Sequence, residues 1–183
     1  MTDWDFLLVP YGGTSVNTGL QIRVQLSLLE KRTLRFLFLL EGPPAALNKV
    51  VWPKAVQPER RNELWKTTCF ELFFGPAEAR PYFEMNLSPS GDWNVYAFSD
   101  YREGMKEATI ESPFRMSETS PLPRVEGLLD LSSLGLRLEK TGDAVLGATA
   151  VMEYQDGQKE YWALAHKGDK PDFHVRSSFT AYL

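Results

Sequence analysis

The sequence predicts an all-β fold, a single antiparallel β-sandwich. Three observations predict it: many short segments in which apolar and polar residues alternate, turn-forming residues between them, and scarcely any helical periodicity. A chain of 183 residues with 43% hydrophobic residues suits one folded domain, and no internal repeat or long linker divides it. We therefore expect one domain over residues 1–183.

Alternation places the predicted strands in order along the chain. Branched aliphatic residues occupy every second position over residues 20–28, and a similar pattern returns over residues 34–40 after a turn. Residues 100–108 are the one candidate for a short helix, although Gly104 weakens it. The remaining predicted strands are residues 70–74, 82–87, 93–98, 125–131, 134–138, 145–154 and 161–165, and the proline-rich stretches 43–62 and 112–123 are predicted as irregular surface loops.

The register of one predicted hairpin follows from its side-chain pattern. Paired residues on antiparallel strands point to the same face, and pairing Leu87 with Trp93 sets apolar residues opposite apolar ones. Residues 88–92 then form the loop. The predicted core face carries Phe83, Met85, Leu87, Trp93, Val95 and Ala97, and the other, which we name the polar-aromatic face, carries Tyr82, Glu84, Asn86, Asn94, Tyr96 and Phe98.

A second hairpin is predicted near residues 154–159. Its turn contains Asp156 followed by Gly157, and this dipeptide is the strongest short-range signal for a tight hairpin turn. The strands on either side, residues 145–154 and 161–165, are therefore expected to pair with each other.

Composition and charge exclude several classes of protein. The chain has 20 Lys plus Arg against 24 Asp plus Glu, a net charge of −4, whereas nucleic-acid binders usually present a basic face. No apolar run approaches the ~20 residues of a membrane span, and the acidic start MTDWDFLLVP lacks the features of a signal peptide. The single cysteine, Cys69, excludes an intrachain disulfide. We therefore expect a cytoplasmic protein that binds neither nucleic acid nor membranes.

The polar-aromatic face is the first candidate for a binding site. Sugar recognition uses flat rings that stack on the C–H faces of a pyranose, and planar polar side chains that bond two hydroxyls at once. The alternative is a solvated sheet face with scattered aromatic residues. Residues of suitable type on this face and in the flanking segments are Trp65, Glu71, Glu84, Asn86, Asn94, Tyr96, Tyr101 and Arg102.

Glu71 stands out because of its neighbours in the predicted strand. It shares a face with Cys69 and Phe73, so its carboxylate is expected to be partly buried, and a buried carboxylate needs partners. One alternative is an ion pair with Lys66 or with an arginine of a neighbouring strand. Trp65, at the entrance of this strand, could equally cap the core.

An enzymatic role has little support in the sequence. Cys69 could act as a nucleophile with His166 or His174 as base and Asp172 as orienter. A lone cysteine in a strand is more often an inert, small apolar residue. The sequence has no phosphate-binding glycine loop and no GxSxG motif, so we expect a protein that is not an enzyme.

The two histidines suggest further alternatives. With Asp169 and Asp172, His166 and His174 could bind a divalent metal, because imidazole and carboxylate are competent ligands. One histidine could instead pair with a methionine, such as Met85, to ligate haem iron. Otherwise both histidines would hydrogen-bond loop carbonyls and fix the C-terminal segment. No cofactor is expected on balance.

Three segments together resemble a known family. They are LWKTTCFELF at residues 64–73, YFEMNLSPSGDWNVYAFSDYREGM at residues 82–105 and ALAHKGDKPDFHVRSSF at residues 163–179. In wording and order they are similar to the bacterial DOMON-like proteins, which are related to the family 9 carbohydrate-binding modules of xylanases. The resemblance covers about residues 19–179 and implies an immunoglobulin-like or jelly-roll β-sandwich. Members of the wider superfamily bind sugars or b-type haem.

The resemblance also implies roles for particular residues. In the sugar-binding modules, a tryptophan six positions before a glutamate forms one side of an aromatic clamp, and the glutamate bonds ring hydroxyls. Trp65 and Glu71 match this spacing. The modules carry a second clamp tryptophan near the C-terminus, where this chain has Phe173 and His174 instead.

These observations lead us to expect non-catalytic binding of a carbohydrate or glycan-like small ligand. Trp65 would stack on the sugar, while Asn86 and Arg102 would join Glu71 in bonding its hydroxyls. Asp172, Phe173 and His174 would close the site from the C-terminal segment. A haem- or metal-binding domain is one alternative, and a structural sandwich whose edge strands pair with a partner protein is another.

Overall fold

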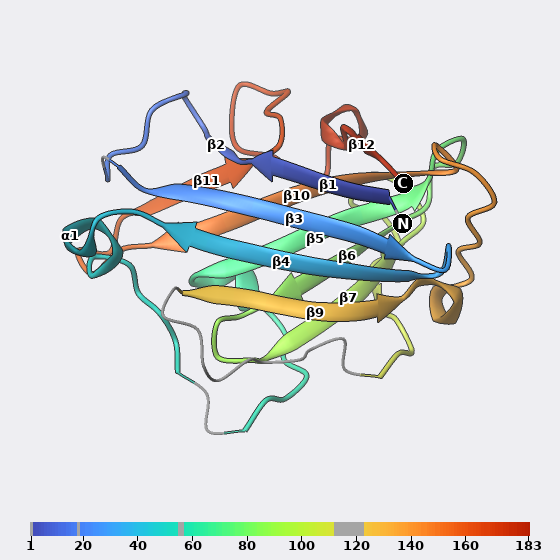
Figure 1. The fold of residues 1–183 in the computed structure, drawn as a ribbon, viewed down its shortest axis with the longest axis horizontal. Helices are drawn as coiled ribbons and strands as arrows, with labels where there is room; N and C mark the ends of the chain where they lie inside the picture. The colour runs from blue at the N-terminus through green and yellow to red at the C-terminus, as the bar shows by residue number, and fades with distance from the viewer. Residues whose placement is uncertain (1, 18, 55–56, 112–122) are drawn as a thin grey trace.

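The chain forms an antiparallel β-sandwich in a computed structural model that describes residues 2–17, 19–54, 57–111 and 123–183 (Figure 1). The smaller sheet has the order β1 (Thr2–Leu7), β3 (Gln21–Leu29), β4 (Thr33–Glu41) and β9 (Arg124–Asp130). The larger sheet has the order β2 (Val9–Pro10), β11 (Lys159–Ala163), β10 (Ala144–Glu153), β5 (Cys69–Pro76), β6 (Tyr82–Leu87), β7 (Trp93–Phe98) and β8 (Lys106–Glu107), and β12 (Ala181–Tyr182) also pairs with β10. The helical elements are short: α1 (Pro44–Leu47) and the 3-10 turns η1 (Leu64–Lys66), η2 (Leu131–Leu134) and η3 (Arg176–Ser178).

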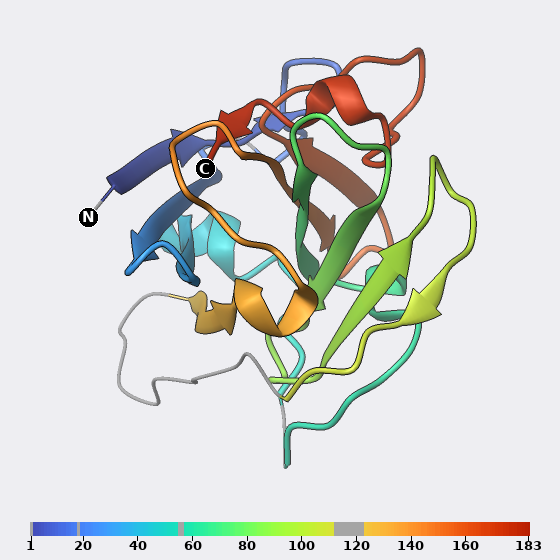
Figure 2. The ribbon, with the colours of Figure 1, turned by 90° about the vertical axis from the view of Figure 1, so that its right-hand side faces the viewer.

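The two sheets pack face to face around the main core. Figure 2 shows β1, β3 and β4 on one side of the molecule and β5, β6 and β7 on the other. The rings of Phe38 in β4 and Phe70 in β5 meet between the sheets, with centroids 5.1 Å apart. Every second residue of β4, and of β3 as far as Leu26, is buried, as the alternation predicts, because successive side chains of a strand point to opposite faces.

The predicted hairpin register is confirmed. Leu87 pairs with Trp93, and the pairing continues to Tyr82 opposite Phe98. Met85 and Val95 point into the core between the sheets and are fully buried. The polar-aromatic face is buried as well, since each of its six residues is at most 6% exposed, so it is not a solvated sheet face.

A second, smaller core covers the outer face of the larger sheet. Phe73, Tyr82 and Phe98 gather there beneath residues 164–180, the C-terminal segment between β11 and β12. The ring of Phe179 in this segment packs 5.8 Å from the ring of Phe73. Gly147 in β10 permits this close approach, because a Cβ at that position would lie 2.9 Å from the Phe179 ring. The C-terminal segment therefore packs closely on the outer face of the larger sheet.

Two predicted elements are wrong. Residues 134–138 do not form a strand: η2 ends at Leu134, and Gly135 follows in the left-handed region with φ of 75°. Their alternation has another origin, because Leu136 and Leu138 are buried against the main core from an irregular segment. Residues 100–108 do not form a helix either. Arg102 and Gly104 both have positive φ and make a turn, after which β8 begins.

The other predicted strands correspond to β3, β4, β5, β6, β7, β9, β10 and β11. The hairpin near residues 154–159 is confirmed, since Glu153 pairs with Lys159 and Gly157 turns the chain with φ of 82°. Strands β1, β2, β8 and β12 were not predicted. The predicted loop at 43–62 contains α1 and is otherwise largely irregular where it is described, whereas most of the predicted loop at 112–123 lies outside the described residues.

None of the helices in the described residues has the length and apolar character needed to cross a membrane.

Candidate ligand-binding site

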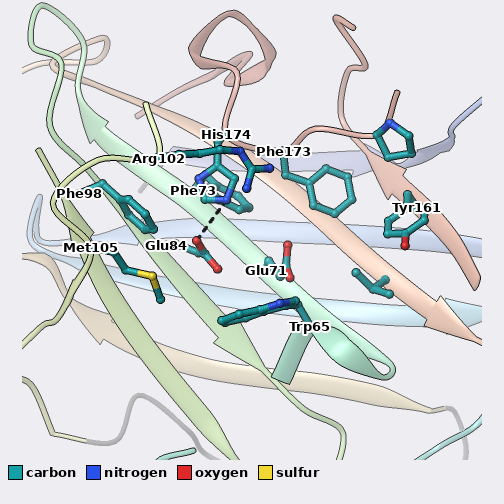
Figure 3. A pocket seen from close by; sticks show the side chains of 12 residues that line it. Trp65, Glu71, Phe73, Glu84, Phe98, Arg102, Met105, Tyr161, Phe173 and His174 are labelled. Atoms are coloured by element: carbon teal, nitrogen blue, oxygen red, sulfur yellow. Dashed lines mark ion pairs between the residues drawn. The ribbon is translucent and has the colours of Figure 1, made fainter. Parts of the chain in front are cut away.

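A cavity of about 350 Å³ opens on the outer face of the larger sheet (Figure 3). Strands β5, β6, β7, β10 and β11 form its floor, η1 and the turn before β8 form one side, and the C-terminal segment forms the other. Its lining residues are Trp65, Glu71, Phe73, Glu84, Phe98, Arg102, Met105, Val151, Tyr161, Pro171, Phe173 and His174.

Strand pairing brings the two acidic side chains of this cavity together. Cys69, Glu71 and Phe73 alternate with core residues, so Glu71 points outward from β5. Glu71 pairs with Asn86 and Phe73 pairs with Glu84, which makes Glu71 and Glu84 diagonal neighbours on the same face. Both side chains project into the cavity (Figure 3).

Glu71 lies at the bottom of the cavity and is only 2% exposed. Its Oε2 accepts a hydrogen bond of 3.0 Å from Thr149 Oγ1 on β10. Burial, followed by the charge of Glu84, raises the pKa of Glu71 well above its ordinary value. The alternative of an ion pair with Lys66 does not hold, because Lys66 Nζ lies 2.7 Å from Glu63 Oε2. No arginine takes its place within 4 Å of Glu71 in the described residues.

Glu84 is also buried, and it faces His174. Its Oε1 accepts a hydrogen bond of 2.7 Å from Asn86 Nδ2, and its Oε2 lies 3.6 Å from His174 Nε2. Burial raises the pKa of Glu84 to about 7. Burial and the nearby charge of Arg102 lower the pKa of His174 to about 4, so the imidazole is neutral at neutral pH. The contact between Glu84 and His174 is therefore not an ion pair of full charges at neutral pH.

Tyr82 fixes the orientation of the His174 ring. Its hydroxyl lies 2.7 Å from His174 Nδ1 and accepts a hydrogen bond of 3.2 Å from the Arg102 backbone N–H. In the neutral imidazole, a Tyr82 hydroxyl that donates to Nδ1 leaves the proton on Nε2, which faces Glu84. The ring also packs edge-on against Phe73 and Phe98, at 5.1 and 5.2 Å between centroids.

Aromatic rings form the walls of the cavity. Trp65 lies across the opening from Phe173, with the two glutamates between and behind them (Figure 3). The indole of Trp65 is half-buried and meets Tyr96 edge-on at 5.9 Å. Trp65 therefore packs against the outer cluster of the larger sheet and does not cap the core between the sheets.

Arg102 and Asp172 tie the C-terminal segment to the turn before β8. Arg102 Nη2 lies 2.9 Å from Asp172 Oδ1, and the same carboxylate accepts hydrogen bonds from the Tyr101 hydroxyl and the His174 backbone N–H. Burial raises the pKa of Asp172, but the hydrogen bonds from Tyr101 and Arg102 outweigh burial and lower it overall. This link holds Phe173 and His174 over the sheet.

The structure thus divides the predicted site residues into two groups. Trp65, Glu71, Glu84, Arg102, Phe173 and His174 line the cavity, whereas Asn86, Asn94, Tyr96, Tyr101 and Asp172 support it from behind or from its rim. Asn94 is fully buried and bonds Asn62, the Arg61 carbonyl and Arg60. The Tyr96 hydroxyl donates to Asn62 Oδ1 at 2.6 Å.

Sequence reasoning did not assign the remaining lining residues, which are Phe73, Phe98, Met105, Val151, Tyr161 and Pro171. Phe73 and Phe98 carried a usable signal, because alternation places each on the same face as a candidate glutamate. Tyr161 and Val151 are brought to the cavity by the pairing of β10 with β11. The β10–β11 hairpin itself is predicted by its turn, but its place beside β5 depends on the order of strands in the sheet, which local patterns do not specify.

The alternative chemistries find less support in the geometry. Met85 points into the core between the sheets, so the larger sheet separates it from His174, and these two residues cannot ligate one haem. His166 Nε2 lies 2.9 Å from the Val9 carbonyl, the kind of loop contact expected for a structural histidine, whereas His174 contacts Tyr82. No group of three or more metal-ligating side chains occurs in the described residues.

Burial raises the pKa of the fully buried Cys69 thiol well above its usual range, which disfavours a thiolate nucleophile.

Comparisons with known proteins show the fold. No family model and no curated protein matches the chain. Among solved structures, it is similar to a crystal structure described as a "putative carbohydrate-binding protein" from Bacteroides uniformis ATCC 8492, with a TM-score of 0.63 and 13% identity. The match covers 87% of this chain and 76% of that chain. The two proteins share a β-sandwich, and at this identity the likeness extends to the fold alone.

Proposed function

We propose that this protein binds a carbohydrate or glycan-like small ligand without catalysis, in the cavity between Trp65 and Phe173. One observation carries the proposal: an open aromatic wall stands beside two buried, outward-pointing carboxyl groups, Glu71 and Glu84. Apolar C–H faces of a sugar pack against such rings, and its hydroxyls pair with such carboxyls. The fold shared with the Bacteroides uniformis protein is consistent with this use of the sheet.

The size of the cavity suits a small ligand. Its volume of about 350 Å³ lies near the lower end of the roughly 300–1,000 Å³ of small-molecule sites. That volume favours one or two sugar rings over a long glycan held along its length. Rigid strands carry the two glutamates, and the Tyr82–His174 contact holds the opposite wall, so the site is preorganised before a ligand binds.

Intrinsic tryptophan fluorescence tests the proposal. The wild-type protein is titrated with hexoses, amino sugars and disaccharides, and a saturable change is expected. Replacing an aromatic anchor commonly costs about 1–3 kcal/mol of binding, so Trp65→Ala should weaken affinity roughly 5- to 150-fold. Trp52→Phe is the matched control, because Trp52 packs against Phe70 of the main core. An affinity that Trp65→Ala leaves unchanged would contradict the proposal.

A further inference from the structure

The buried carboxyl groups of Glu71 and Glu84 have no positively charged partner of their own. Glu71 has one hydrogen bond from the Thr149 hydroxyl, and Glu84 has one from the Asn86 amide, and both donors are neutral. Within the part of the chain that the structure describes, no lysine or arginine lies within 4 Å of either carboxyl. Buried acidic groups are normally paired with a cation or a metal ion.

The charged and titratable groups around Glu71 and Glu84 do not supply the missing positive partner. Arg102 lines the cavity, but its guanidinium is bound to Asp172 at 2.9 Å, so the two charges offset each other. His174 is neutral at neutral pH because burial lowers its pKa. Burial also raises the pKa of Tyr82, Tyr96 and Cys69, which keeps the two hydroxyls and the thiol protonated. None of these neighbouring groups therefore supplies a free positive charge to the two carboxyls.

The walls of the same cavity are suited to a cation. Trp65, Phe73, Phe98, Tyr161 and Phe173 line it, and the face of an aromatic ring attracts a positive charge within about 6 Å. Aromatic rings that surround a positive charge are a recurring means by which proteins bind ammonium ligands. A neutral sugar would use the rings for packing and would leave both carboxyl groups without a positively charged partner.

We propose that the ligand carries a positively charged amino group, as an amino sugar with a free amine does, and that its ammonium group binds between Glu71 and Glu84. The inference rests on the proposed function, because it names the class of sugar for the same cavity. Thr149 and Asn86 hold the two carboxyls in place from behind, and each carboxyl keeps oxygen lone pairs for the ammonium protons. The sugar ring packs against Trp65.

Binding of a ligand with an ammonium group should ionise the carboxyl groups of Glu71 and Glu84. In the free protein, burial raises the pKa of Glu84 to about 7 and that of Glu71 well above its ordinary value. A cation between the carboxyls favours their charged forms, so binding releases protons to the buffer. A neutral sugar produces no such release.

Isothermal titration calorimetry with four related compounds tests the inference at neutral pH. Glucosamine carries the free amine, glucose lacks it, N-acetylglucosamine has lost its charge, and cyclohexylamine keeps the amine on a ring without hydroxyls. We expect glucosamine to bind about tenfold or more tightly than glucose and N-acetylglucosamine. Its binding enthalpy should change with the ionisation enthalpy of the buffer, which reports proton release.

The outcomes separate this inference from the proposed function. Equal affinities for glucosamine and glucose would overturn the ammonium site and leave sugar binding standing. Cyclohexylamine binding as tightly as glucosamine would support the ammonium site and contradict sugar recognition. Binding of none of the four would contradict both.

A substitution that keeps the shape of the glutamate side chain tests whether the carboxyl groups cause the preference for glucosamine. Glu84→Gln keeps the size of the side chain and removes its charge, so the ratio of glucosamine to glucose affinity should fall toward one. Glu126→Gln, on β9 in the other sheet, is the matched control and should keep the wild-type ratio. An unchanged ratio in Glu84→Gln, with circular dichroism showing a folded protein, would overturn the assignment.

Discussion

Glu71 and Glu84 differ from the other acidic side chains in the described residues, because these two alone are buried. Taking a carboxylate out of water is costly unless it is paired, and the protein meets part of that cost by raising the pKa of both groups. A buried acidic pair at the floor of an aromatic cavity is typical of a site that binds a ligand.

Glu84→Gln should change how stability depends on pH. The pKa of Glu84 rises from 4.5 to about 7 on folding, so between these values the folded state holds more protons than the unfolded state. The free energy of unfolding contributed by Glu84 therefore falls as pH rises through this window. A glutamine at this position cannot ionise, so the variant should gain up to about 3 kcal/mol relative to wild type by the time pH passes about 7.

Urea unfolding followed by circular dichroism at several pH values measures this gain. His174 acts in the opposite direction, because its pKa falls from 6.5 to about 4 on folding and its contribution to stability rises with pH over that range. His174 is present in both proteins, so taking the difference between variant and wild type removes most of its effect. A difference that stays constant from pH about 4.5 to about 8 would show that Glu84 is not buried as described.

For single residues, the sequence indicated which side-chain types belong to the site, but it predicted only in part which of them line the cavity. Trp65, Glu71 and Glu84 could be selected because alternation and spacing are local properties. Asn94 is of a type suited to sugars, yet its hydrogen bonds go to Asn62, Arg60 and the Arg61 carbonyl. The local sequence does not distinguish an amide side chain that faces the cavity from one whose hydrogen bonds are all made to protein groups behind it.

Secondary-structure elements position the cavity through close packing of the C-terminal segment on β10. Phe179 lies over Gly147, where even a methyl group would approach the ring to 2.9 Å. The same segment carries Phe173 and His174, which form one wall of the cavity. The position of that wall therefore depends on the absence of a side chain at Gly147.

Gly147→Ala should destabilise the fold and disturb the site together. The added Cβ forces the Phe179 ring to move, and overpacking of this kind costs about 1–3 kcal/mol. Thermal unfolding and fluorescence titration measure the two effects. Gly168→Ala is the matched control, because its Cβ would lie no closer than 3.4 Å to any neighbour. A loss of stability no greater than that of the control would contradict the packing, and Phe179→Leu should partly restore the Gly147→Ala variant.

Local alternation predicted the central strands because both sheets bury one face between them. It failed for residues 134–138, where buried leucines alternate in an irregular segment beyond Gly135. It also failed to find β1, although Thr2–Leu7 pairs with β3 along its length. Trp4 and Phe6 alternate with aspartates, but the consecutive apolar residues Leu7, Leu8 and Val9 interrupt the alternation after two repeats.

The whole molecule combines two layers of packing, one between the sheets and one on the outer face of the larger sheet. Residues far apart in the sequence meet in the second layer: Glu71 contacts Thr149, and Tyr82 contacts His174. These contacts depend on strand order, which single-sequence patterns do not determine. The sandwich could therefore be predicted from the sequence, while the cavity required the assembled sheet.

The five tryptophans give the most direct test of a ligand site on this outer face. They are Trp4, Trp52, Trp65, Trp93 and Trp162, and only Trp65 lines the cavity. Their indole N–H resonances can be followed by ¹H–¹⁵N NMR during titration with glucosamine and glucose, with Trp65→Phe used for assignment. We predict a saturable shift of the Trp65 resonance, with Trp4 in the other sheet and Trp93 in the main core unmoved. A titration that shifts Trp4 or Trp93 and leaves Trp65 unmoved, or that shifts none of the five, would contradict ligand binding at this site.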